Sequence, residues 1–569
     1  MKRRIFRCFT GILTAAALTA CASGAGAGTA AKAPEEAAAE APAEASAETT
    51  VQPVAAAGES ESEETAQPEE AAAYAGQDSG VTYEIFVYSF CDSDGDGIGD
   101  LGGVRQKLGY IANDLGCSAI WLTPVFPSPT YHKYDALDYY SIDPQFGSME
   151  DFEGLVSDCH EKGLRLYMDL AVNHTSDAHP WFLKAADEIR NSGAADGEAA
   201  SMYNFSPEQK TGYAPLSGSD WFYEARFWSG MPDLNLSNEK VRQEIKNIAD
   251  FWLDKGVDGF RLDAVTSYYT DSSDESEEFL SWLTKTVKEK NPDAYLVGEI
   301  WTDQNTYARY YGTGIDSVFD FAFAGPDGII ASVVKGSRGA AVYPEALAAE
   351  EALYAGYNPE YINAPFYTNH DMARSAGYYA YDDGSRTKLA GALNLLMPGN
   401  VFIYYGEEIG MKGSGKDENK RAPMQWKEGA PGSDGMCQGP PDMDAVSMKF
   451  APLEEQMADP QSVWTYYRDA VLLRKQYPVI AQGRTRAIPD WPEDRNLCAF
   501  VREPAGDEKD GASPLMIIIN TGEEAAEIDI NSCPEDMKSI CAQLNVSGEK
   551  ASLDGGILRL PAFGIVVLK

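Results

Sequence analysis

Hydrophobic positions after about Val81 follow two alternating patterns. Short runs rich in β-branched and aromatic residues, typical of strands, are separated by segments with a helical period. In one such segment Val241, Ile245, Ile248 and Trp252 recur at helical spacing. The strand-like runs are eight in number: YEIFVYSF, CSAIWLTP, LRLYMDLAVNH, VDGFRLDAV, AYLVGEIW, SVFDFAF, FYTNHD and NVFIYYGEE.

This alternation predicts an α/β fold with parallel strands and crossover helices, and eight repeats favour a closed (β/α)8 TIM barrel over residues 81–174 and 230–480. An open doubly wound sheet is the alternative, but its usual glycine-rich phosphate loop is missing. The stretch 175–229 is too long for a plain loop, so we expect a small inserted domain after strand 3. Short strands with turn signals predict a C-terminal antiparallel β-sandwich over 481–569.

The amino terminus, MKRRIFRCFTGILTAAALTAC, has a basic start, an apolar run too short to span a bilayer, and small residues before Cys21. Its LTAC ending resembles a bacterial lipobox, so residues 1–21 are predicted to be a lipoprotein signal peptide. Lipidated Cys21 would then anchor the chain to the extracellular face of the cell membrane. An ordinary signal peptide is the alternative. Residues 22–80, rich in Ala, Glu and Pro, predict a disordered acidic stalk.

The formal net charge of -42 limits the partners of the chain. Nucleic acids and anionic lipid headgroups are recognised largely through Lys and Arg, so neither fits this composition, and the lipid anchor would be the only membrane contact. A neutral or polar ligand fits better. We expect the chain to act as a monomer.

Polar residues gather at or near the carboxyl ends of the predicted strands, the face that carries the chemistry in barrel enzymes. Arg261 and Asp263 stand two residues apart on one strand, so their side chains point to the same face. A buried ion pair is costly unless the charges are paired or used. The polar residues at strand ends are Asp169, Asn173, His174, Arg261, Asp263, Glu299, Asn369, His370 and Asp371.

Three carboxylates, Asp263, Glu299 and Asp371, dominate this candidate site. The chain offers no Ser-His-Asp order with an elbow motif and no H-E-x-x-H zinc spacing. Acid, base and nucleophile would therefore be carboxylates. Glycosidic bond cleavage is the reaction that most needs such a pair, with one group to attack or stabilise the sugar cation and one to protonate the leaving oxygen.

The motifs DLAVNH, MPDLN, GFRLDAV, GEIW and TNHD, in this order, resemble the signature regions of the alpha-amylase family, glycoside hydrolase family 13. The resemblance covers the chain from about Val81 onward and implies a retaining reaction. It implies that Asp263 is the nucleophile, Glu299 the general acid/base and Asp371 the third carboxylate. The resemblance also places Arg261 beside the nucleophile and implies that Tyr134, His174, Asn369 and His370 bind the sugar. The two main carboxyl groups are expected about 5 to 5.5 Å apart.

The stretch DSDGDGIGD has acidic residues at alternate positions with glycines between them, a pattern suited to an oxygen cage for Ca²⁺. A solvated acidic turn is the alternative, since Gly103 stands where an EF-hand would have its closing glutamate. The family resemblance favours the metal, because many members carry a structural calcium here. Its ligands would be Asp92, Asp94, Asp96, Asp100 and the Ile98 carbonyl.

The sequence indicates the type of glycosidic bond and the substrate less clearly than it indicates the family. By the resemblance, Ala264 directly after the nucleophile goes with α-1,4 bonds, whereas RAPMQW is frequent in α-glucosidases and trehalose-acting relatives. Tyr131 stands where exo-acting relatives hold the terminal glucose with an aspartate. We therefore expect an endo-acting alpha-amylase for starch and maltooligosaccharides. The alternatives are an exo-acting α-glucosidase or oligo-1,6-glucosidase, a neopullulanase-like hydrolase, an α-glucan transglycosylase, and a non-catalytic glycan-binding relative.

Overall fold

The computed structural model describes residues 80–270, 272–505 and 513–569. The predicted signal peptide and the predicted stalk, apart from Gly80, lie outside these residues. The chain divides into two units, residues 1–71 and 72–569, and the fold described below belongs to the second unit. Within the described residues, none of the helices has both the length and the apolar character needed to cross a membrane.

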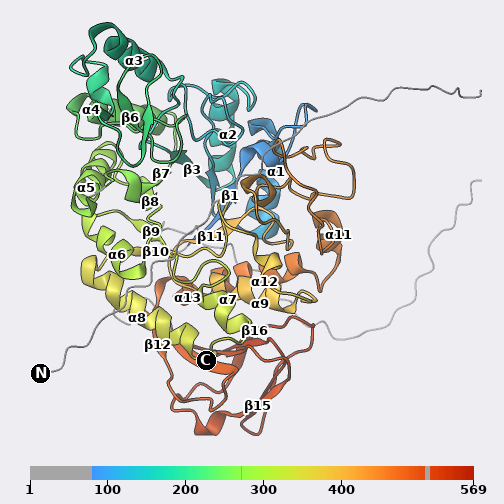
Figure 1. Cartoon of the computed structure of the whole chain (residues 1–569). Coiled ribbons are helices and arrows are strands. Elements are labelled where there is room, and N and C mark those ends of the chain that lie inside the picture. Colours follow the sequence, from blue (N-terminus) through green and yellow to red (C-terminus); the bar gives the residue numbers. More distant parts are fainter. Residues whose placement is uncertain (1–79, 271, 506–512) are drawn as a thin grey trace, which may run out of the picture. The chain divides into compact units, whose positions relative to one another are not determined.

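Eight parallel strands form the main sheet in the order β10–β9–β8–β7–β3–β2–β1–β11 (Figure 1). Two backbone hydrogen bonds join its ends, from Asn400 N–H to the Asn363 carbonyl (2.8 Å) and from Phe402 N–H to the Pro365 carbonyl (2.7 Å). The predicted TIM barrel is therefore confirmed. The strands are β1 (Val81–Ile85), β2 (Ala119–Leu122), β3 (Arg165–Leu170), β7 (Gly259–Leu262), β8 (Tyr295–Gly298), β9 (Ser317–Phe319), β10 (Ile362–Ala364) and β11 (Val401–Tyr404).

Helices connect successive strands of the barrel, and several begin at side chains that accept a hydrogen bond from the first turn, such as Ser148, Asn238 and Ser272. In α4, Val241, Ile245, Ile248 and Trp252 are all buried, as the helical spacing predicts. The helices in and around the barrel are α1 (Leu101–Gly109), α2 (Met149–Glu161), α4 (Glu239–Asp254), α5 (Ser273–Lys290), α6 (Gln304–Arg309), α7 (Ile329–Val334), α8 (Val342–Tyr357), α9 (Ser385–Leu395), α10 (Asp417–Lys420), α11 (Leu453–Ala458), α12 (Val463–Gln476) and α13 (Val479–Gln482).

The seventh barrel strand begins earlier than the sequence pattern predicts. The pattern places it in FYTNHD, from Phe366 to Asp371, whereas β10 covers Ile362–Ala364. Pro365 has no amide hydrogen for a ladder bond, and beyond it only Phe366 still bridges to β11. The segment up to Asp371 therefore leaves the barrel wall at its carboxyl end, where its side chains are free to serve a site.

A small inserted unit stands between β3 and α4, after the third strand as predicted. It contains α3 (Pro180–Ser192) and a three-stranded antiparallel sheet of β4 (Phe205–Ser206), β6 (Phe222–Glu224) and β5 (Tyr213–Pro215), in that order. Phe182 of α3 packs edge to face against Tyr203 and Tyr223, with ring centroids 5.1 and 4.8 Å apart. These aromatic contacts form the apolar part of the insertion, which is continuous with the core of the barrel.

The C-terminal part is a sandwich of two antiparallel sheets, ordered β12–β13–β14–β19–β16 and β15–β18–β17. A second apolar cluster lies between them, with Ile518 from one sheet and Leu558 from the other. Buried Arg502 joins this part to the barrel through a 2.9 Å ion pair with Glu351 of α8. The strands are β12 (Arg484–Ala487), β13 (Leu497–Glu503), β14 (Leu515–Asn520), β15 (Ala526–Asp529), β16 (Ile540–Leu544), β17 (Ser552–Asp554), β18 (Ile557–Leu560) and β19 (Ile565–Leu568).

Candidate active site

The register of the parallel strands brings the predicted acidic residues together at the carboxyl end of the barrel. Asp169 of β3 pairs with Arg261 of β7, and Leu262 pairs with Gly298 of β8. The next residue along each of these last two strands is Asp263 or Glu299, so the two carboxylates leave neighbouring strands at the same level. Sheet geometry alone therefore makes them neighbours.

Arg261 is the shared partner of three carboxylates. Its side chain is buried, and Nη1 donates to Asp169 Oδ1 at 2.8 Å and to Asp263 Oδ1 at 2.7 Å. Its Nη2 lies 3.1 Å from Glu299 Oε2. The pair two residues apart on β7 thus points to one face, as predicted, and the guanidinium links the two expected reacting groups. Burying these charges is tolerable because the cation is present.

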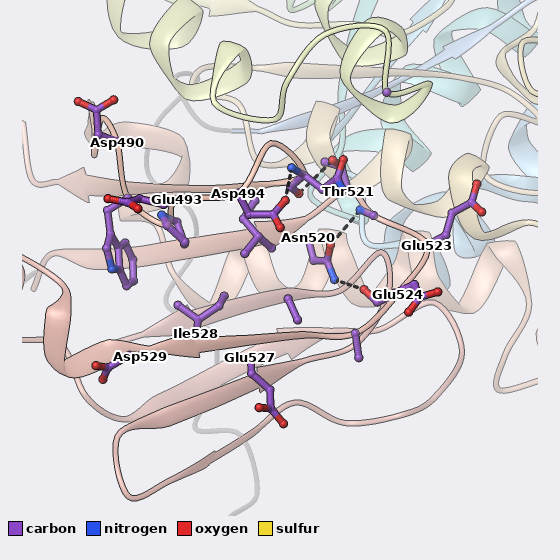
Figure 2. Close-up of a pocket in the computed structure, with 18 of the residues that line it drawn as sticks. Asp490, Glu493, Asp494, Asn520, Thr521, Glu523, Glu524, Glu527, Ile528 and Asp529 are labelled. Carbon is purple, nitrogen blue, oxygen red and sulfur yellow. Dashed lines mark hydrogen bonds between the residues drawn. The ribbon is translucent and has the colours of Figure 1, made fainter.

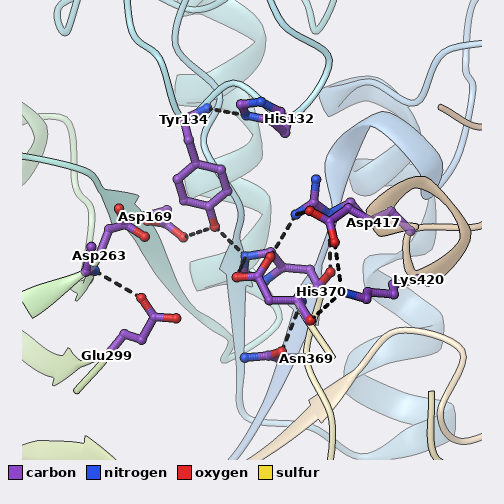
Figure 3. A network of polar contacts seen from close by, with 12 residues as sticks. His132, Tyr134, Asp169, Asp263, Glu299, Asn369, His370, Asp417 and Lys420 are labelled. Carbon is purple, nitrogen blue, oxygen red and sulfur yellow. Dashed lines mark hydrogen bonds and ion pairs between the residues drawn. The ribbon is translucent and has the colours of Figure 1, made fainter. Parts of the chain in front are cut away.

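A backbone turn fixes Glu299 from a second side. Ala264, directly after Asp263, has a left-handed conformation (φ 49°, ψ 40°), which is uncommon for a residue with a side chain. In this conformation its N–H donates to Glu299 Oε2 at 3.0 Å (Figure 3). The strained turn therefore ties the position of Glu299 to the residue that follows Asp263.

Burial and charge set the protonation of these groups. Burial raises the pKa of both Asp263 and Glu299, and Arg261 works against that rise in each. Burial also raises the pKa of Asp169 to about 7, again opposed by Arg261. A glutamate whose pKa burial raises can keep the proton that a leaving oxygen needs, while the Arg261 cation favours the ionised form that a nucleophilic Asp263 needs.

A second chain of polar contacts runs through His370, which is fully buried. Its Nδ1 lies 2.6 Å from Glu84 Oε1 on β1, and its Nε2 lies 2.7 Å from the Tyr134 hydroxyl and 3.2 Å from Asp371 Oδ2. Figure 3 shows the Tyr134 hydroxyl between His370 and Asp169. Burial alone would lower the pKa of His370, but Asp371 and Glu84 raise it to about 10, so the imidazole is a cation.

Asp371 is held ionised by cations on its other side. Arg421 Nη2 donates to its Oδ1 at 2.7 Å, while Lys420 donates to its backbone carbonyl at 2.8 Å. Although burial works in the opposite direction, His370 and Arg421 keep the pKa of Asp371 well below its usual value. Asn369 accepts the Asp371 N–H through its side-chain oxygen (3.0 Å). Asp371 is therefore a fixed negative charge.

A cavity of about 380 Å³ lies over these groups, a size that suits a small polar ligand. Its wall includes Asp263, Glu299, Asp371, Tyr134 and His174, all expected at the site. It also includes neighbours of these residues and two further segments, around 227–231 and 417–421. These additional residues are His132, Phe227, Trp228, Met231, Ala264, Thr266, Ser267, Trp301, Asp417 and Arg421.

The predicted sugar-binding residues divide into two kinds. Tyr134 and His174 line the cavity, and burial lowers the pKa of His174 to about 4, so its ring is neutral. Its buried Nε2 has no hydrogen-bond partner within the described protein and is available to a ligand. Arg261, His370 and Asn369 do not line the cavity: Arg261 and His370 contact its carboxylates, and Asn369 accepts the Asp371 backbone N–H.

Sequence reasoning missed several residues of the site. Glu84 and Arg421 contact His370 and Asp371 across 286 and 50 positions of sequence, so no local pattern connects them. Trp301 belongs to the GEIW motif and could have been singled out, whereas Trp228 stands in no motif that the sequence analysis used. Both tryptophans line the cavity and are half-exposed.

The acidic loop after β1 is close to the predicted metal cage but is not identical with it. Ligand oxygens of Asp92, Asp94 and Asp100 lie within 4.8 Å of one another. Asp96 is outside this group, and its carboxylate accepts the Ile98 N–H at 2.7 Å. Carboxylate oxygens are hard donors of the kind that calcium prefers. The loop thus fits a hard cation with three predicted side chains rather than four.

A TIM barrel whose strand ends present paired carboxylates under a sugar-sized cavity defines the chain as a glycoside hydrolase. The alpha-amylase catalytic-domain family model matches residues 84–483. Alpha-amylase 3 of Dictyoglomus thermophilum is 40% identical over 445 residues, which covers 77% of this chain and 84% of that protein. The probable oligo-1,6-glucosidase 3 of Bacillus subtilis is 30% identical over 504 residues, covering 74% and 88%.

Among solved structures, Eubacterium rectale Amy13B matches with a TM-score of 0.82 at 44% identity, covering 87% of this chain and 96% of that one. The chain belongs to the alpha-amylase family, glycoside hydrolase family 13.

Replacing Arg261 tests its electrostatic role. In Arg261→Gln the cation that lowers the pKa of Asp263 and Glu299 is gone, so both values should rise further, by about 1–3 units for a lost neighbouring charge. The nucleophile Asp263 must be ionised and the acid Glu299 protonated, so both limbs of the pH–activity profile should move to higher pH as the maximal rate falls. Arg468→Gln, at a partly exposed pair with Asp469, is the control. A profile with unchanged limbs in Arg261→Gln would contradict this role.

Proposed function

We propose that the protein is an endo-acting hydrolase of α-1,4 bonds in starch-type glucans and maltooligosaccharides. The observation that carries this proposal is the pair Asp263 and Glu299, joined through Arg261 beneath a cavity that His174 and Tyr134 also line. One guanidinium between two buried carboxyl groups holds them close to each other. Retaining cleavage needs that arrangement.

In the proposed reaction Asp263 attacks the anomeric carbon as Glu299 gives its proton to the departing glycosidic oxygen. The bond between that oxygen and the anomeric carbon breaks, and a covalent glycosyl-enzyme forms on Asp263. Glu299, now ionised, takes a proton from water, and the resulting oxygen displaces Asp263 from the sugar. Two displacements at one carbon retain its configuration. Asp371 and His174 would hold the sugar hydroxyls throughout.

Endo action is supported by the walls of the cavity. Phe227 and Trp228 come from the inserted unit, Trp301 follows β8, and all three side chains are about half-exposed. Flat aromatic surfaces on separate segments suit successive sugar rings. Tyr131 stands where an aspartate would hold a terminal glucose, and a tyrosine offers no carboxylate there. Its hydroxyl instead accepts a hydrogen bond from Arg421 (2.8 Å). The higher identity to an alpha-amylase, 40% against 30% for an oligo-1,6-glucosidase, favours the same choice.

Removing the nucleophile and resolving the products tests this function. Asp263→Asn should lower starch hydrolysis by about 10³-fold or more, as loss of a covalent nucleophile does, with little change in folding. The control is Asp254→Asn, whose exposed carboxylate pairs only with Lys290 in the described contacts. The unaltered enzyme should release mixed maltooligosaccharides from starch and products with retained anomeric configuration. Glucose as the sole early product would assign the alternative, an exo-acting α-glucosidase.

We further propose that the loop of Asp92, Asp94 and Asp100 holds a structural calcium ion. The support is the closeness of their carboxylate oxygens and the position of the loop. The Asp92 N–H donates to the Gly435 carbonyl, and the Gln438 N–H donates to the Gly97 carbonyl. A cation there would neutralise three adjacent carboxylates and fix the loop against the segment around Gly435. It would not touch the sugar. Its contribution would be to stability.

Chelation tests the calcium proposal. A ligand bound to the native state at about a hundredfold its Kd stabilises by about 3 kcal/mol, so a chelator should lower the thermal midpoint of the purified protein. Asp94→Asn should remove most of that calcium response. Asp96→Asn is the matched control, since Asp96 lies in the same loop but outside the group of three. Equal responses in both variants would argue for an ordinary acidic turn.

We also propose that the protein is a lipoprotein displayed on the outer face of the cell membrane, anchored through Cys21. The support is the sequence around LTAC and the long acidic segment before the barrel. In cell fractionation the intact protein should stay with membranes, and Cys21→Ala should lose the lipid and leave that fraction. An unlipidated wild-type chain found only in the medium would overturn the anchor and favour an ordinary signal peptide.

A further inference from the structure

A second and larger hollow lies at one edge of the C-terminal sandwich. It measures about 1140 Å³ and shares no wall residue with the active-site cavity. Its walls come from five places: the connection between β12 and β13 (488–496), the connection between β14 and β15 (521–525), strand β15, the segment that follows β15 (532–534), and barrel residues near the end of α7 and the start of α9. We call this space the sandwich hollow.

Two contacts hold the walls of the sandwich hollow to the barrel. Arg495, in the first connection, donates to the carbonyls of Gly336 (2.7 Å) and Ser337 (3.2 Å), and its own carbonyl accepts the Ala340 N–H (2.8 Å). In the second connection, Glu523 pairs with Arg386 of α9. Both connections are therefore held against the barrel. The hollow is a preformed space rather than a gap between loose loops.

The chemistry of the hollow combines one large aromatic surface with many acceptors. Trp491 packs partly against the sandwich core and is oriented by its Nε1–H, which donates to Ser532 Oγ at 3.1 Å. Carboxylates border the same space, and Figure 2 shows them on both connections. Among the described residues, the carboxylates of Glu493 and Glu524 have no hydrogen-bond or ion-pair partner. They are free to accept hydrogen bonds from a ligand.

Charge and spacing narrow the class of ligand. Seven acidic residues line the hollow against Lys335 and Arg386, so anions are repelled. The carboxylates of the hollow do not fit a shared metal ion. In the described part of the chain, only Asp92, Asp94 and Asp100 bring three possible metal-ligand atoms within 4.8 Å of one another. A neutral polyhydroxyl ligand fits, since its hydroxyls can donate to carboxylates while its C–H faces cover the indole ring. The acidic residues are Asp490, Glu493, Asp494, Glu523, Glu524, Glu527 and Asp529.

We propose that the sandwich hollow is a second, non-catalytic binding site for a segment of α-glucan. The ligand identity rests on the proposed function, because the α-glucan that the active site would cleave is the neutral polyhydroxyl polymer that the enzyme meets. Binding there would hold the enzyme on a polymer between cleavage events by raising the local substrate concentration. Short substrates, which cannot span both sites, would gain nothing from it.

Binding to the inactive full-length variant Asp263→Asn tests the proposal without hydrolysis. Calorimetric titration with maltoheptaose should detect two sites per chain. Adding Trp491→Ala should remove one, or weaken it about tenfold as loss of an aromatic anchor does, while Trp491→Phe should retain most of the affinity. Tyr381→Ala is the matched control, because Tyr381 is a fully exposed aromatic residue outside both cavities.

Activity assays give a second readout in the enzyme with Asp263 intact. Trp491→Ala should lower adsorption to granular starch and the rate on it several-fold, with maltotriose hydrolysis unchanged. The double variant Glu493→Gln/Glu524→Gln changes two exposed side chains without touching the core, and should lower adsorption in the same way. This second variant keeps the test valid if Trp491→Ala unfolds the sandwich.

The outcomes separate this proposal from the catalytic one. Detection of only one maltoheptaose site in Asp263→Asn would overturn the second site while leaving the proposal of starch hydrolysis intact. The same conclusion would follow if two sites persisted both with Trp491→Ala and with Glu493→Gln/Glu524→Gln. Absence of starch hydrolysis by the wild-type enzyme, with the hollow still binding maltoheptaose, would overturn the catalytic proposal instead. Binding of an oligolysine probe to the hollow in place of maltoheptaose would overturn the assignment to glucan.

Discussion

One buried guanidinium governs the active site. Arg261 contacts Asp169, Asp263 and Glu299 within 3.1 Å, and its side chain is 1% exposed. Removing an ionised carboxylate from water costs several kcal/mol even after relaxation of its surroundings. Two of these carboxylates could not be buried as anions so close together without a cation. The barrel can therefore bring an acid and a nucleophile to neighbouring strand ends only because this strand also supplies the arginine.

The rest of the site separates charge into fixed and movable groups. His370, cationic between Glu84 and Asp371, and Arg421 together keep Asp371 permanently ionised. Glu299 is different, because burial raises its pKa, and among the described residues only the Ala264 amide and Arg261 contact its carboxylate. A proton can therefore come and go at Glu299 while the field around it stays constant. Such preorganised charge is what glycosidic cleavage requires.

The sequence predicts those features that depend on local pattern. The eight strand runs, the buried face of α4 and the three carboxylates all follow from periodicity and motif. The position of β10 does not follow from the pattern. Because of Pro365, the strand ends at Ala364, before the run FYTNHD, in which only Phe366 still bridges to β11. The partners Glu84 and Arg421 do not follow from the pattern either, since contacts across 286 and 50 positions depend on closure of the barrel. The sandwich hollow could not be predicted from the sequence either, because its walls come from segments that lie far apart in the chain.

The account depends most directly on a covalent bond between sugar and Asp263. A fluorinated maltosyl fluoride, whose electron-poor ring slows hydrolysis of the intermediate, can be incubated with the enzyme, and the protein can then be digested and its peptides mapped by mass spectrometry. The account predicts one added glycosyl group on the peptide that contains Asp263, and its loss when fresh acceptor restores turnover. A label on Glu299 or Asp371, or stoichiometric inactivation with an unmodified Asp263, would contradict it.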